Sequence, residues 1–132
     1  MWKRLETFYR NLEQKHTPER YFEICEQLGR DIDPDKIPPE WRDFPESVQV
    51  AINIYNTLGD RVVADIGYLG KDYTLLNHLM EVYDVDDLEL TLDIVLWLEN
   101  RMIKNSAEAL KKEHDKIKKK SKAAKGPVKG MP

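Results

Sequence analysis

The sequence predicts an all-α fold, a compact irregular bundle of about five helices with a long, protruding C-terminal helix and a disordered basic end. Three observations predict this fold. Apolar residues recur at helical spacing in five segments. Four of these segments carry residues that start or stop helices. No two segments have the matching strand patterns that a sheet requires.

The first two helices are predicted from their apolar faces. The first spans Trp2 to about Gln14, and its face consists of Trp2, Leu5, Phe8, Tyr9 and Leu12. The second begins at Pro18, with Thr17 as its cap, and ends at Gly29 in a left-handed conformation. Its buried stripe is expected to consist of Tyr21, Phe22, Ile24, Cys25 and Leu28.

A loop and a third helix follow. Residues 30–44 contain three prolines, which predict a loop because residues before proline avoid the helical region. We expect the loop to be pinned by Ile37, Trp41 and Phe44. Pro45 opens the third helix, and Gly59 stops it.

Residues 60–70, with the sequence "DRVVADIGYLG", are predicted to form an irregular loop. Val62, Val63 and Ile66 could form a short extended piece, but no partner strand is evident. The pair Gly67 and Gly70 followed by Lys71 raises the question of a phosphate-binding loop. A Walker loop needs a longer spacing and a Ser or Thr after the lysine, whereas here Asp72 would repel phosphate. The G-x-x-G loop of KH domains also needs a three-stranded sheet. We interpret the glycines as a corner between two helices, at positive φ.

Two further helices are predicted after this corner. Asp72 is expected to cap the fourth, and Asp86 with Glu89 has capping-box spacing at the start of the fifth. The side chains predicted to point inward from the fourth are Leu75, Leu76, Leu79, Met80 and Tyr83. The predicted stripe of the fifth is Leu88, Leu92, Val95, Leu96, Met102, Ile103 and Leu110, widened by Leu90, Ile94, Trp97 and Leu98. Nothing breaks this helix before Gly126, a length of about 55–60 Å.

Charge divides the chain into an acidic helical body, residues 1–110, and a basic C-terminal helix extension and flexible tail, residues 111–132. The formal net charge is −3. Residues 111–129 carry nine lysines and only two carboxylates, so the rest of the chain is strongly acidic. The basic part must project, fray or lie on another surface, because so short a chain cannot cover a helix of that length.

No catalytic, cofactor or metal constellation is evident in the sequence. The three histidines lie in different segments without neighbouring ligands, and the lone Cys25 falls on an apolar stripe. No segment resembles a signal peptide or a membrane span. We therefore expect a cytoplasmic protein that is not an enzyme and has no cofactor, no metal, no membrane association and no evident small-molecule substrate.

These features predict a protein-interaction module, an adaptor or an assembly or chaperone-type accessory factor. Its size and charge layout resemble those of small phage or bacterial accessory proteins, although this resemblance fixes no residue. The predicted partner-binding residues are Trp2, Trp41, Tyr68, Lys71 and Tyr73. The alternative is nucleic-acid binding through Lys111, Lys112, Lys116, Lys118, Lys119, Lys120, Lys122 and Lys125. A third reading has the basic tail dock on the acidic body or on a second copy.

Overall fold

The computed structural model describes residues 1–125 and confirms a mostly helical fold with a long C-terminal helix. It falls into two compact units, Met1–Gln49 and Val50–Pro132. The predicted division into an acidic body, residues 1–110, and a basic extension, residues 111–132, rests on charge and is not tested by these two units, so it stays a prediction. The predicted disordered end, residues 126–132, lies outside the described residues. Among the described residues, no helix combines the length and apolar character that crossing a membrane requires.

The first unit contains α1 (Trp2–Glu13), α2 (Pro18–Leu28) and two short 3-10 helices, η1 (Pro34–Lys36) and η2 (Trp41–Asp43). The predicted start and stop of α2 are confirmed, since the Thr17 side chain accepts a hydrogen bond from the Arg20 amide and Gly29 is left-handed. Phe44 is buried and makes an edge contact with Phe8, so it pins its loop as expected. The predicted stripe of α2 was largely wrong, because Phe22, Ile24 and Leu28 are exposed.

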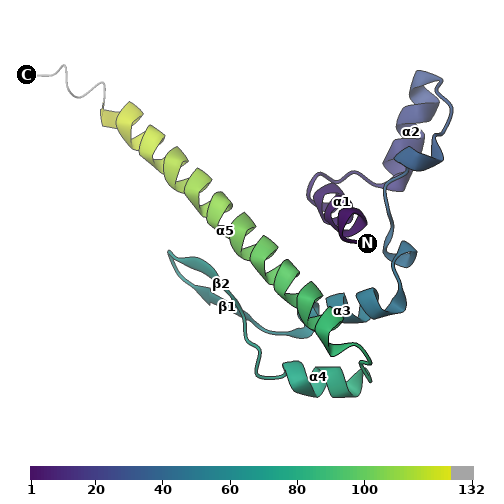
Figure 1. Cartoon of the computed structure of the whole chain (residues 1–132). Coiled ribbons are helices and arrows are strands. Elements are labelled where there is room, and N and C mark those ends of the chain that lie inside the picture. The colour runs from purple at the N-terminus through teal and green to yellow at the C-terminus, as the bar shows by residue number, and fades with distance from the viewer. Residues whose placement is uncertain (126–132) are drawn as a thin grey trace, which may run out of the picture. The chain divides into compact units, whose positions relative to one another are not determined.

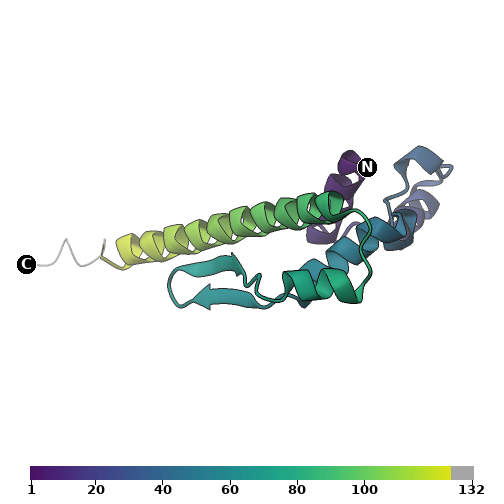
Figure 2. The same ribbon diagram turned by 60° about the horizontal axis from the view of Figure 1, so that its bottom comes forward.

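The second unit contains most of α3 (Glu46–Thr57), then β1 (Asp60–Val63), β2 (Gly67–Lys71), α4 (Leu76–Val82) and α5 (Leu88–Lys125). The irregular loop predicted for residues 60–70 was wrong. These residues form an antiparallel hairpin, in which β1 and β2 pair with a bulge between Arg61 and Val62. The hairpin lies alongside α5 in both ribbon views (Figure 1, Figure 2).

The predicted cap of α4 was also wrong. The Asp72 carboxylate accepts hydrogen bonds from the amide and the hydroxyl of Thr74, and Asp72 lies four residues before the first residue of the helix. Leu75 and Tyr83, predicted to point inward, are exposed. At the start of α5, Asp87 rather than Asp86 accepts the hydrogen bond of the Leu90 amide.

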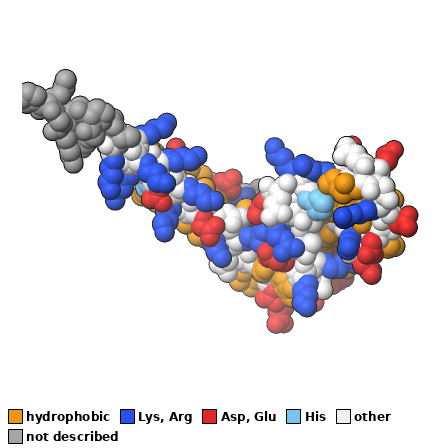
Figure 3. All heavy atoms as spheres, turned by 90° about the horizontal axis from the view of Figure 1, so that it is seen from above, with side chains coloured by type: hydrophobic (Ala, Val, Ile, Leu, Met, Phe, Trp, Pro, Cys, Tyr) orange, Lys and Arg blue, Asp and Glu red, His pale blue; other side chains and the backbone are white. Residues whose placement is uncertain are grey.

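The helix α5 is one unbroken element of 38 residues. Its buried side chains are Thr91, Ile94, Val95, Leu98 and Glu99. The predicted stripe was therefore partly wrong, because Leu88, Leu92, Leu96 and Ile103 are exposed. From Lys111 to Lys122 every side chain is exposed, and lysine side chains gather along this end of α5 in the space-filling view (Figure 3).

Candidate functional site

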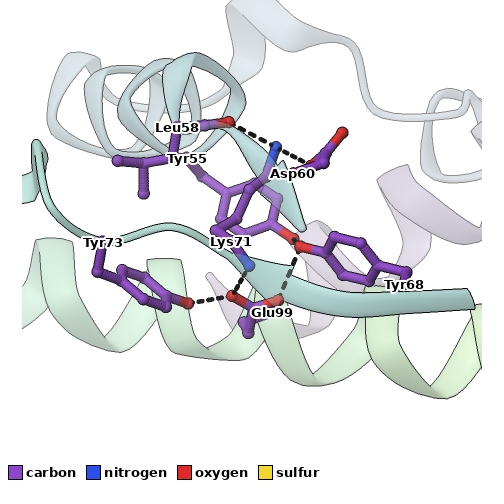
Figure 4. Close-up of polar contacts among 7 residues, drawn as sticks. All are labelled: Tyr55, Leu58, Asp60, Tyr68, Lys71, Tyr73 and Glu99. Carbon is purple, nitrogen blue, oxygen red and sulfur yellow. Dashed lines mark hydrogen bonds and ion pairs between the residues drawn. The ribbon is translucent and has the colours of Figure 1, made fainter. Parts of the chain in front are cut away.

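The hairpin is attached to α5 through the carboxylate of Glu99, which is only 7% exposed. Its Oε1 accepts a hydrogen bond from the Tyr68 hydroxyl at 2.8 Å. Its Oε2 accepts one from the Lys71 amide at 2.8 Å and another from the Tyr73 hydroxyl. One carboxylate thus gathers donors from β2 and from the segment that follows it (Figure 4).

Gly70 allows the strand to approach this carboxylate. Its φ is +111°, and a Cβ added there would lie 3.2 Å from Glu99 Oε1. Glycine suits such a position because it adopts positive φ without strain and leaves room for a neighbouring group. The prediction that Gly67 and Gly70 have positive φ is confirmed, although they lie in a strand rather than at a corner between helices.

The side chain of Lys71 is held inside the second unit and is 8% exposed. Its ammonium lies 2.7 Å from Asp60 Oδ1, donates to the Leu58 carbonyl at 3.1 Å, and sits 4.8 Å from the centre of the Tyr55 ring. These contacts join β2 to the end of α3 and the start of β1. A buried ammonium is stable only with such partners.

The tyrosine hydroxyls form a short chain that ends at the carboxylate. The Tyr55 and Tyr68 hydroxyl oxygens are 3.1 Å apart. Because Tyr68 donates its one proton to Glu99, Tyr55 donates to Tyr68. Burial raises the pKa of Tyr68 and of Tyr73, and hydrogen bonding to Glu99 raises both further. Both side chains therefore stay neutral donors.

The pKa of Glu99 is lowered. Burial acts to raise it, but the hydrogen bonds from Tyr73, Lys71 and Tyr68 and the positive charge of Lys71 outweigh burial. Hydrogen bonds to the ionised form have this effect because protonation would break them. Since a carboxylate stabilised as an anion is a weak base, this cluster is suited to attachment rather than to proton transfer.

A groove of about 420 Å³ lies next to this cluster, between the hairpin and α5. Apolar groups form much of its lining, and Lys111, His114 and Asp115 lie at its C-terminal end. Its remaining lining residues are Ile66, Tyr68, Ile103, Ser106, Ala107 and Leu110. The Tyr68 amide donates to Ser106 Oγ at 3.4 Å, which helps to hold the hairpin beside α5 at this position.

The apolar side of the groove continues along α5. Ile103, Leu110 and Ile117 are spaced by seven residues, so they lie on one side of the helix. Ile117 is 60% exposed, and so is Ile66 at the hairpin end. This row, Ile103, Leu110 and Ile117, is called the heptad row below.

The structure separates the five predicted partner-binding residues. Trp2 and Trp41 lie in the first unit, whereas Tyr68, Lys71 and Tyr73 meet at Glu99 in the second. The polar groups of these three are used in internal contacts, and only Tyr68 also lines the groove. The sequence reasoning missed Ile66, Ala107 and the heptad row as surface residues. The seven-residue spacing was the signal that could have found the row.

Comparison with protein-family models, with curated proteins and with solved structures finds no match. Within the described residues, no group of three His, Cys, Asp or Glu side chains is arranged to hold a metal ion. Function must therefore be argued from the groove, the heptad row and the lysines of α5.

Proposed function

We propose that the protein is an interaction module that binds a segment of a partner protein in the groove between the hairpin and α5. The observation that supports this is the continuity of the surface. The groove leads into the heptad row, which runs into the exposed lysine-bearing end of α5. A partner segment would lie along the helix and contact apolar and basic groups in turn.

The chemistry of the surface defines the partner segment. Apolar side chains at helical spacing would pack on the heptad row, each stabilising the complex by at most about 1.5–3 kcal/mol. Residues 111–122 carry seven lysines and two carboxylates, so carboxylates on the flanks of the segment would be attracted to them. The fitting partner is an acidic amphipathic helix.

Charge should govern the rate of encounter more than the final affinity. Exposed lysines steer a negatively charged partner by long-range attraction, which salt screens over about 10 Å at 0.1 M. Apolar contact in the groove should then set the dissociation rate. Fast association through charge and dissociation set by apolar contact would suit an adaptor or assembly factor that must capture and release a partner.

Site-specific photo-crosslinking tests the proposal. A photoreactive amino acid replaces Ala107, which lines the groove, or Ala109 as the matched control. Both alanines are exposed, but residues two apart on a helix do not share a face. We expect one defined protein crosslinked from position 107 in cells of the source organism and not from position 109. The product should disappear with Lys118→Glu, Lys119→Glu and Lys120→Glu combined. Identical products from both positions, or none, would contradict the proposal.

Nucleic-acid binding is the second candidate, favoured by the exposure of every side chain in residues 111–122. Lysine contacts to phosphates are independent of sequence, and each weakens with salt with a log–log slope of about −0.9 on duplex DNA. These residues contain no arginine, Phe, Tyr or Trp, so guanidinium readout of bases and stacking on those rings are not available to them. A mobility shift that is steep in salt and lost on deletion after Leu110 would support this candidate. A shift that survives the deletion would refute the role of the lysines.

A further inference from the structure

A cavity of about 710 Å³ lies within the first unit, between one side of α1 and residues 34–39. Four cationic side chains line it, with His16 beside them and Asp35 as the one carboxylate. The cations are Lys3, Arg4, Arg10 and Lys36. Such a concentration of positive charge is unexpected in a body whose overall charge is strongly negative.

Two of the cations, Lys3 and Arg4, are placed where they do not stabilise the helix, whereas Arg10 lies in the last turn of α1. Lys3 and Arg4 lie in the first turn of α1, which has no acidic residue and no side-chain cap. The helix dipole disfavours cations at this end. Within the first unit, Lys3, Arg10 and Lys36 form no ion pair, and Arg4 has only a contact of 3.9 Å with Asp43 between exposed side chains. Residues that oppose local stability, as Lys3 and Arg4 do at the start of α1, are typical of functional sites.

The wall that faces α1 is apolar and stiff. It includes Pro34, Ile37, Pro38 and Pro39, and Pro38 is buried. Proline rings fix the backbone, so this wall is largely preformed. Thr7 and Asn11 add polar atoms on the helix side. The volume lies within the range of about 300–1,000 Å³ typical of small-molecule sites.

We propose that this cavity binds a phosphate-bearing small molecule, with its phosphates on the α1 cations and its ring or apolar part against the proline wall. Two guanidinium groups offer the forked donors that suit phosphate oxygens. Four cations match a ligand with more than one negative charge. This site lies in the first unit and is independent of the proposed partner groove.

An NMR titration of the full chain tests the site, with inorganic pyrophosphate and adenosine diphosphate as probes. We expect saturable shifts in the backbone amides of residues 3–16 and 35–37 with both probes. Adenosine diphosphate should bind at least as tightly, because its rings can contact the proline wall. Combining Arg10→Ala with Lys36→Ala should raise the Kd about tenfold or more, since charged hydrogen bonds are lost.

The matched control combines Arg20→Ala with Arg30→Ala. It removes the same charge from exposed positions of the same unit that do not line the cavity. Arg10 and Lys36 are exposed too, so both variants should stay folded. The amide resonances of each variant should therefore remain as widely dispersed as those of the original protein. The proposal is overturned if both variants weaken binding equally, or if sulfate at equal ionic strength competes as well as pyrophosphate. It is also overturned if a glutamate-rich peptide binds the cavity and neither phosphate does.

Discussion

Replacing Glu99 with glutamine should loosen the hairpin from α5 more than any other conservative change in the second unit. The amide oxygen can keep the two donors at the Oε2 position, Lys71 N–H and Tyr73 O–H, as neutral hydrogen bonds. The amide nitrogen cannot accept the proton of Tyr68, which bonds Oε1. Hydrogen bonds to a charged group contribute about 1.5–3 kcal/mol each and neutral ones about half as much, so losing the Tyr68 bond and making the other two neutral costs about 3–6 kcal/mol.

Amide hydrogen exchange at Lys71 measures this loss locally. A local probe is preferable because a chain with two compact units need not unfold in one transition. A loss of about 3 kcal/mol or more makes exchange at least about 100-fold faster, since 1.4 kcal/mol is a factor of ten. The control Glu108→Gln removes the same charge from an exposed position of α5 and should change exchange by less than about threefold, which corresponds to roughly 0.5 kcal/mol. Equal exchange in the two variants would refute the role assigned to Glu99.

Four further predictions concern the same unit. Lowering the pH should destabilise the hairpin, because the pKa of Glu99 is lowered in the folded protein. The stability that this carboxylate contributes is present above its unfolded pKa, about 4.3 for Glu, and is lost as the pH falls from there through the folded pKa. Proton NMR from pH 7 to 3 should show an acid transition that Glu99→Gln flattens. Gly70→Ala should destabilise the unit by at least about 1–3 kcal/mol, through its φ and the contact with Glu99, whereas Gly59→Ala, with open space around it, should have a smaller effect in thermal unfolding. Asp60→Asn should destabilise the unit more than Asp60→Asn combined with Lys71→Met, because the single change leaves a buried ammonium without its counter-charge; additive effects in a double-mutant cycle would count against the ion pair. Ile117→Glu should leave thermal unfolding unchanged, because the side chain is 60% exposed, but should abolish the crosslink from position 107; an intact crosslink would exclude the heptad row from the interface.

Periodicity and capping predicted the helices because their signals are local. Thr17 and Gly29 mark the ends of α2 by chemistry that lies within a few residues in sequence. The length of α5 followed from the lack of any breaker before Gly126. These elements did not need knowledge of what they pack against.

The hairpin and the buried faces could not be predicted because they depend on distant residues. β2 contains two glycines, which are rare in strands, and its pairing reflects a bulge in β1 and the approach of Gly70 to Glu99. Along the chain, Glu99 is one of many exposed-looking carboxylates, and only the tertiary structure brings three donors to it. The inward face of α5 was misassigned for the same reason, since Leu92 and Leu96 fit an apolar stripe as well as Val95 and Leu98 do.

Nuclear Overhauser contacts between the hairpin and α5 test the central claim most directly, because the groove exists only if the hairpin is held beside the helix. The Tyr68 amide lies 3.4 Å from Ser106 Oγ, and Leu110 lines the same groove. The account predicts cross-peaks from the Tyr68 amide proton to the Ser106 β protons and from the Gly67 α protons to the Leu110 methyl groups. A paired hairpin with cross-strand contacts but without cross-peaks to α5 would contradict it.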